Sequence, residues 1–228
     1  MPVYNAPFLQ IDPKETRRYA GLMKAADFDE QKIADACQDA RLLAAPKGIW
    51  QVYDYDCQTQ EVKAAPPCII EGTKIGAHLA GCDKVILLSA TVGDEIEETV
   101  TRRFAEGEYT ASVLLDAAAT TAVEQLADGM EKAIRPRAAA QGYQLRWRFS
   151  PGYGDWPIEQ QPEVLRLAHG EEIGVSLSSS MMLIPRKSIT AIIGLYKEDK
   201  SKGNPAARHD LHGCRACDRL DCPSRKTK

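Results

Sequence analysis

The spacing of apolar residues along the chain predicts a mixture of helices and strands. Apolar residues three and four positions apart indicate amphipathic helices, and short apolar runs bounded by turn residues indicate strands. On this basis helices are expected at 13–26, 28–44, 73–80, 94–105, 108–139 and 161–168. Strands are expected at 49–53, 58–63, 84–89, 143–149, 172–177 and 189–195.

The expected helix over 108–139 is apolar on nearly all sides. One stripe along it is Leu115, Ala118, Ala119, Ala122, Leu126 and Met130, and a second stripe on roughly the opposite side is Val113, Ala117, Thr120 and Glu124. A helix of this kind is usually buried on two faces. Glu124 would then be a carboxylate at a buried or cleft-facing surface, where a charge needs a partner.

The run 143–149 alternates apolar and polar residues with a period of two. A regular strand here would place Tyr143 and Phe149 on one face and Arg148 on the other. A guanidinium at a strand end is a planar fork that suits a carboxylate, and the Pro151–Gly152 turn allows backbone amides to approach a ligand. The segment therefore suggests capture of a small molecule with a carboxylate, although a solvated arginine and an ordinary turn would give the same pattern.

Composition places the chain among globular proteins, with 44% hydrophobic and 27% charged residues. The net charge of −3 argues against nucleic acid as a partner, and no apolar run is long enough to span a bilayer. Residues 1–12 lack the pattern of a secretory signal, so we expect a cytoplasmic protein. We expect one domain over 1–196, followed by a linker and a cysteine-rich tail over 197–228.

Three of the seven cysteines lie close together in the tail. Cys214, Cys217 and Cys222, with His212, are soft ligands at a spacing that zinc or an iron–sulfur cluster could use. A tail of reduced thiols without a metal is the alternative. The other four cysteines are scattered, which favours reduced core thiols over a disulfide framework.

Three segments together resemble a known family. Arg148-x-x-x-Gly152-Tyr153 resembles the S-adenosylmethionine-binding signature of the activation (reactivation) domain of cobalamin-dependent methionine synthase. The helix around 122–126 is similar to the long helix of that domain with its functional glutamate, and 180–195 is similar to its core strand. The resemblance covers about residues 82–196.

The resemblance implies an α+β fold, with a twisted, largely antiparallel sheet and long packed helices. It also implies binding of S-adenosylmethionine, with Arg148 gripping the methionine carboxylate and Glu124 balancing the cationic end. The ligand-binding residues that it implies are Glu124, Arg148, Ser150, Pro151, Gly152, Tyr153 and Tyr196. Asp12 is the nearest match to the N-terminal aspartate of that site. The implied role is positioning, with no catalytic residue in this chain.

The resemblance further implies partners. A free-standing member would serve a corrinoid-carrying methionine synthase that lacks its own activation domain, with flavodoxin or ferredoxin as electron donor and cobalamin on the partner. Two alternatives stay open. One is an activator of another corrinoid methyltransferase, in which an iron–sulfur cluster in the tail supplies the electron. The other is a non-catalytic adaptor that caps a corrinoid protein.

Overall fold

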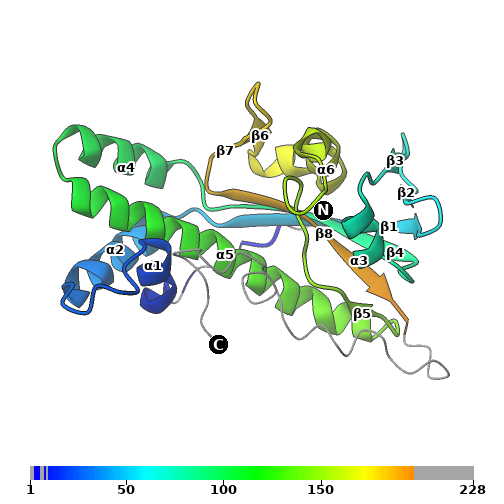
Figure 1. The fold of residues 1–228 in the computed structure, drawn as a ribbon, viewed down its shortest axis with the longest axis horizontal. Helices are drawn as coiled ribbons and strands as arrows, with labels where there is room; N and C mark the ends of the chain where they lie inside the picture. Colours follow the sequence, from blue (N-terminus) through cyan, green and yellow to red (C-terminus); the bar gives the residue numbers. More distant parts are fainter. Residues whose placement is uncertain (1–2, 6–7, 9, 198–228) are drawn as a thin grey trace.

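A computed structural model describes residues 3–5, 8 and 10–197 of the chain (Figure 1). The helices in this part are α1 (Pro13–Tyr19), α2 (Glu30–Leu43), α3 (Thr73–His78), α4 (Glu95–Ala105), α5 (Tyr109–Ala139) and α6 (Gln161–Ala168). Short 3₁₀ turns, η1 and η2, cover Ile158–Gln160 and Gly170–Ile173. The strands are β1 (Lys47–Asp56), β2 (Glu61–Val62), β3 (Cys68–Ile69), β4 (Lys84–Thr91), β5 (Gln144–Leu145), β6 (Ser176–Leu177), β7 (Leu183–Ile184) and β8 (Ser188–Tyr196).

Within the described residues, six strands form one sheet in the order β3-β2-β1-β4-β8-β5. Every neighbouring pair in it is antiparallel. β4 is the central strand, and its whole length pairs with β1 on one side and β8 on the other. The α+β class with an antiparallel sheet and long helices is therefore confirmed.

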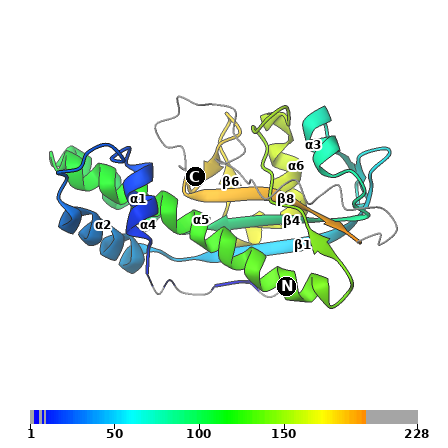
Figure 2. The same cartoon turned by 60° about the horizontal axis from the view of Figure 1, so that its bottom comes forward.

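Successive residues of β4 point into two different cores. Ile86 and Leu88 lie in a core that the sheet shares with α5, whereas Val85 and Leu87 lie in a core that it shares with α3 and α6. Figure 2 shows the same arrangement, with α5 along one face of the sheet and α3 and α6 on the other. A strand buried on both faces reads as a continuous apolar run, which is why 84–89 could be predicted.

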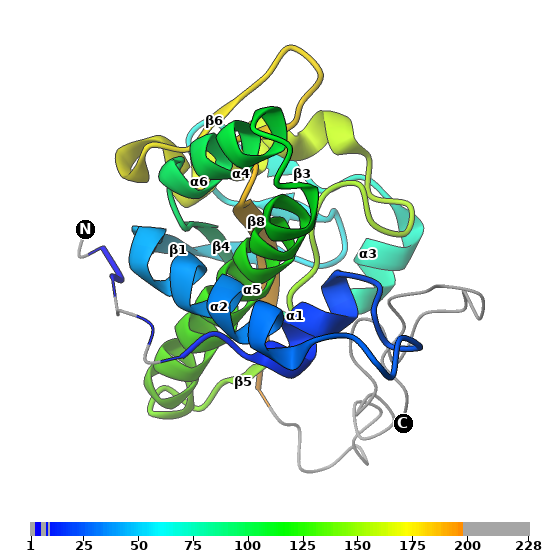
Figure 3. The ribbon, with the colours of Figure 1, turned by 90° about the vertical axis from the view of Figure 1, so that its left-hand side faces the viewer.

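The long helix α5 is buried on two sides, as its sequence predicted. It packs against the sheet and also contacts α1, α2 and α4, which flank it in Figure 3. Ala118, Ala119 and Ala122 are fully buried, and their small side chains allow these elements to approach the helix closely.

Several expected elements are shorter than the sequence suggested, among them the strand expected over 58–63, of which only Glu61–Val62 is strand. The helix expected over 13–26 ends at Tyr19, because Gly21 takes a positive φ of 72° that stops the helix. Half of the strand expected over 172–177 is the end of the 3₁₀ turn η2 and Gly174, which also has a positive φ, so only Ser176–Leu177 is strand. The strand expected over 143–149 is reduced to β5 and one isolated bridge at Phe149.

No helix in the described part of the chain is long and apolar enough to cross a membrane.

Candidate functional site

A β-bulge after β5 determines where Arg148 points. Leu145 pairs with Leu195, and Phe149 forms a bridge with Ile192, so three residues on one strand lie opposite two on the other. One extra residue reverses the alternation of faces. Leu145 packs on the α5 side of the sheet, whereas Phe149 packs on the α3 side. The expectation that Tyr143 and Phe149 share a face is therefore wrong.

The bulge turns Arg148 toward α5, where it meets three carboxylates. Its Nη2 donates to Glu124 Oε2 at 2.7 Å, and its Nη1 donates to Asp128 Oδ1 at 2.7 Å and Glu131 Oε1 at 2.5 Å. The three acids follow the i, i+4, i+7 spacing of a single helix face. We call these four residues the Arg148 cluster.

The Arg148 cluster is partly open to solvent. The side chains of Arg148 and Glu131 are 21% and 16% exposed, whereas those of Glu124 and Asp128 are 40% and 57% exposed. Burial alone would lower the pKa of Arg148, but the nearby charges of Glu131, Asp128 and Glu124 outweigh it and raise that pKa above its usual value. The guanidinium therefore stays charged, and the cluster holds three negative charges and one positive charge at neutral pH.

A second cation meets the same face of α5 nearer to its start. Lys187, just before β8, donates to Thr120 Oγ1 at 2.9 Å and lies 2.9 Å from Asp116 Oδ1. Asp116 and Thr120 continue the spacing of the Arg148 cluster toward the N-terminus of α5. The polar face of α5 thus carries a balanced ion pair, Asp116–Lys187, nearer to its N-terminus. The Arg148 cluster, with its excess of carboxylates, lies nearer to its C-terminus.

The N-terminal segment lies beside Glu124. The backbone N–H of Asp12 donates to Gln125 Oε1 at 2.9 Å. The carboxylate of Asp12 accepts from the amides of Lys14 and Glu15, so it is the N-cap of α1. Burial, assisted by the nearby charge of Glu124, raises the pKa of Tyr19 to about 12. Tyr19 is therefore a neutral phenol near Glu124.

The bend that follows Phe149 is held by its own hydrogen bonds. Gly152 has a φ of 85°, and its amide donates to Trp156 O at 2.9 Å. The amide of Tyr153 donates to Ser150 O at 3.2 Å. Tyr153 itself is 69% exposed. The amides of Gly152 and Tyr153, which the sequence suggested could approach a ligand, are thus bonded within the bend.

The bend is also anchored to α3 and to the core. Asp155 accepts from the amides of Thr73 and Lys74 and from the Thr73 hydroxyl, and these bonds lower its pKa to about 2. Trp156 is 1% exposed, and its indole N–H donates to Gln160 Oε1. The chain around Gly152 is therefore fixed at its far end by two contacts.

The structure brings Glu124 and Arg148 together and leads directly from Arg148 into Ser150–Tyr153. It does not bring Tyr196 to them, because Tyr196 packs on the α3 side of the sheet under the guanidinium of Arg146, 4.7 Å away. Sequence reasoning missed Asp128 and Glu131. The signal that could have found them was their helical spacing from Glu124.

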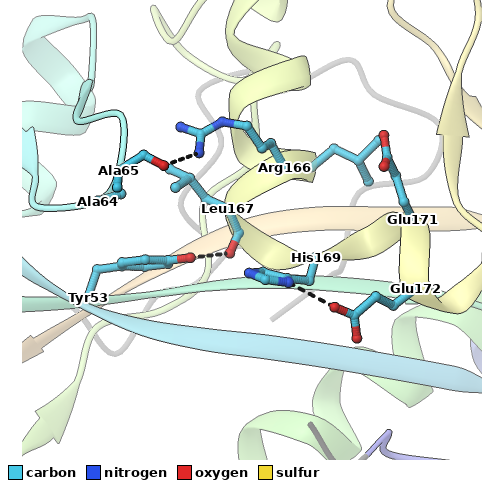
Figure 4. Close-up of a pocket in the computed structure, with 9 residues that line it drawn as sticks. Tyr53, Ala64, Ala65, Arg166, Leu167, His169, Glu171 and Glu172 are labelled. Atoms are coloured by element: carbon cyan, nitrogen blue, oxygen red, sulfur yellow. Dashed lines mark hydrogen bonds and ion pairs between the residues drawn. The ribbon is translucent and has the colours of Figure 1, made fainter.

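An open cavity of about 380 Å³ lies on the opposite face of the sheet (Figure 4). Its polar side chains bond mostly to their own surroundings. Tyr53 donates to Leu167 O, Arg166 bonds Glu163 and the backbone of Ala65 and Pro66, and His169 contacts Glu172. No residue that the sequence singled out lies there, so we place the candidate site at the Arg148 cluster.

The predicted metal ligands His212, Cys214, Cys217 and Cys222 lie outside the described residues. Within the described residues, no group of three or more histidine, cysteine, aspartate or glutamate side chains could hold a metal ion. The described cysteines, Cys37, Cys57, Cys68 and Cys82, are all free thiols. Burial raises the pKa of Cys82 to about 11, so this thiol is unreactive.

Comparison with known proteins gives a match in structure but not in sequence. No family model and no curated protein matches the chain. The chain resembles the crystal structure of a MetH reactivation domain bound to AdoHcy, with a TM-score of 0.58 and 13% identity. The match covers 90% of this chain and 81% of the other. At that identity, the likeness establishes a shared fold.

Proposed function

We propose that this chain binds S-adenosylmethionine at the Arg148 cluster and serves as a stand-alone reactivation subunit for cobalamin-dependent methionine synthase. One observation carries the proposal. In a fold like that of a MetH reactivation domain bound to AdoHcy, Arg148 and Glu124, which lie in two of the segments that resemble the family, are 2.7 Å apart. They come from two different segments of the three that carry the resemblance.

The negative charge of the cluster suits the two cationic groups of the ligand. S-adenosylmethionine carries an ammonium and a sulfonium, and the exposed carboxylates of Glu124 and Asp128 could pair with either. The ligand carboxylate needs a donor. Arg148 Nε–H has no hydrogen-bond partner among the described residues, so a carboxylate could bond there without displacing the three acids.

The proposed contribution of the chain is positioning. Arg148 and Glu124 would hold the amino acid end of the ligand, and the bend at Gly152 would border the rest of it. When present on the partner, the corrinoid supplies the centre that accepts the methyl group after one-electron reduction by flavodoxin or ferredoxin. The residues of this chain would fix the distance and direction of the sulfonium methyl group.

Ligand binding is the first test. We expect calorimetry to show that S-adenosylmethionine binds the wild-type chain, and that Arg148→Ala lowers its affinity at least tenfold. The variant loses the donor to the ligand carboxylate, and the three acids lose the guanidinium that holds them in position. Arg166→Ala is the matched control, because Arg166 also pairs with a carboxylate but lies on α6, on the other face of the sheet. Unchanged binding by Arg148→Ala would contradict the proposed site.

A reductive methylation assay tests the role. The chain is mixed with a cob(II)alamin-loaded synthase that lacks its activation domain, together with reduced flavodoxin and S-adenosylmethionine, and methylcobalamin is followed by its absorbance. We expect its formation to depend on this chain. Stable association with the synthase but no methyl transfer would instead support the adaptor role.

The cysteine-rich tail favours a second candidate, an activator of another corrinoid methyltransferase whose tail carries an iron–sulfur cluster. In that case methylation would proceed with a chemical reductant and no flavodoxin. It would also depend on Cys214, Cys217 and Cys222.

A further inference from the structure

We infer that His78, the last residue of α3, is a positioning residue for Arg148. The inference rests on the proposed function and names a residue that the sequence did not single out. His78 contacts Phe149 on the α3 side of the sheet, whereas Arg148 turns to the α5 side. His78 acts on Arg148 through the backbone of Trp147, and so sets how tightly S-adenosylmethionine is held.

The hydrogen bonds of the bulge give the structural basis. The amides of Arg146 and Phe149 donate to carbonyls of β8 at 2.8 and 2.9 Å. Trp147 O, between them, does not pair with β8 and instead meets His78 Nε2 at 2.9 Å. A carbonyl oxygen can only accept, so Nε2 carries the proton. His78 thus satisfies a backbone group that the extra residue of the bulge takes out of the ladder.

The peptide unit that His78 holds leads directly to Arg148. The carbonyl of Trp147 and the amide of Arg148 belong to one planar group. A bond that fixes this carbonyl therefore also fixes the direction in which the next residue presents its side chain. The contact from Arg148 to Glu124 is 2.7 Å long, and a binding site needs its groups held to within about 0.5 Å.

Packing adds to the hydrogen bond. The centroid of the His78 ring lies 4.3 Å from that of Trp147 and 5.6 Å from that of Phe149. The other end of α3 bonds to the same segment, because the amides of its first turn donate to Asp155. α3 therefore holds this segment both before Arg148 and at the far end of the bend.

Two substitutions separate the hydrogen bond from the packing. His78→Phe keeps an aromatic ring and removes the donor, whereas His78→Gln removes the ring but can place an amide N–H near the position of Nε2. In calorimetry we expect His78→Phe to lower the affinity for S-adenosylmethionine about tenfold, and His78→Gln to stay within about twofold of the wild type.

Tyr53→Phe is the matched control. It also removes a bond of 2.9 Å from a side chain to a backbone carbonyl, that of Leu167, but at the cavity beside α6. We expect its affinity for S-adenosylmethionine to equal that of the wild type. Urea unfolding checks that each variant is folded, and His78→Leu takes the place of His78→Phe if the larger ring does not fit.

Amide hydrogen exchange tests the inference without any ligand. The amide of Phe149 donates to Ile192 O at the end of the bulge. We expect its exchange to become about tenfold faster in His78→Phe, because the bulge opens locally, and to stay at the wild-type rate in His78→Gln. The amides of the central strand β4 should keep their wild-type rates in both variants.

The outcomes separate the inference from the proposed function. Wild-type affinity in His78→Phe, or equal losses in His78→Phe and His78→Gln, would overturn the inference and leave ligand binding intact. An equal loss in Tyr53→Phe would also overturn it. Absence of S-adenosylmethionine binding by the wild type would overturn the proposed function, and the exchange rates would then decide alone whether His78 fixes the bulge.

Discussion

Arg148 donates to Glu124 across 2.7 Å, although the two residues are 24 positions apart in the sequence. The contact joins the bulged segment after β5 to the middle of α5. It also fixes the start of the bend at Ser150–Tyr153. The candidate site therefore depends on one guanidinium that three carboxylates hold in place.

Removing that guanidinium should destabilise the fold as well as the site. Arg148→Ala would leave three carboxylates on one helix face with no cation between them. We expect a loss of about 1–3 kcal/mol in the free energy of unfolding, measured by urea denaturation. Arg166→Ala, whose ion pair is more exposed, should cost under about 1 kcal/mol. Equal losses in the two variants would show that the cluster stabilises the fold no more than a single exposed ion pair does.

A substitution at Gly194 tests the packing beneath the bulge. A Cβ there would lie 2.6 Å from Cys82 Sγ and 2.9 Å from Leu79 Cδ2, both in the buried core on the α3 side. We expect Gly194→Ala to cost about 1–3 kcal/mol in thermal or urea unfolding, because this core has no room for another methyl group. Gly48→Ala should cost less, since the two atoms nearest to its Cβ would be Sδ and Cε, at the end of the flexible Met130 side chain.

The stability contributed by Asp155 should depend on pH. Its pKa is lowered to about 2 by hydrogen bonds from Thr73 and Lys74, below the value of about 3.9 in an unfolded chain. Its contribution is therefore fully present above about pH 4 and is lost as the pH falls toward 2. We expect Asp155→Asn to be less stable than the wild type at pH 6, with the gap closing by pH 2 in urea unfolding. Asp94→Asn, which removes no capping bond, should show no such trend.

The tail should carry a metal. We expect metal analysis of the full chain purified without oxygen to find iron with sulfide, or zinc, and Cys217→Ser to lose it. Cys57→Ser is the control, because Cys57 lies near the sheet and far along the chain from the tail. A full chain with neither metal would indicate that the tail cysteines are reduced thiols. It would also contradict the proposal that an iron–sulfur cluster in the tail supplies the electron.

The sequence predicted those elements whose pattern is set by burial. The helix over 161–168 has the expected bounds, and α5, β4 and β8 lie close to theirs, because two-sided burial gives long apolar patterns. The prediction of a regular strand over 143–149 was wrong for a physical reason. Its alternation is regular, but the bulge comes from pairing with β8, and no local pattern encodes that pairing.

The candidate site was predicted in part. Glu124 and Arg148 were identified separately, and the structure brings them together. Their partners Asp128 and Glu131 were missed because a charged residue on a long helix is usually solvated. Tyr196 was expected beside them but packs beneath Arg146, since the face that a residue at the end of β8 occupies depends on its register.

The anchoring of the bend by Asp155 has a consequence for motion. Asp155 accepts hydrogen bonds from the first turn of α3, so the segment around Gly152 and a helix 82 residues earlier in the chain are mechanically joined. A small molecule that orders the bend should therefore also slow amide hydrogen exchange at Thr73 and Lys74, whose amides bond to Asp155. Protection of these two amides would report occupancy of the bend from a neighbouring helix.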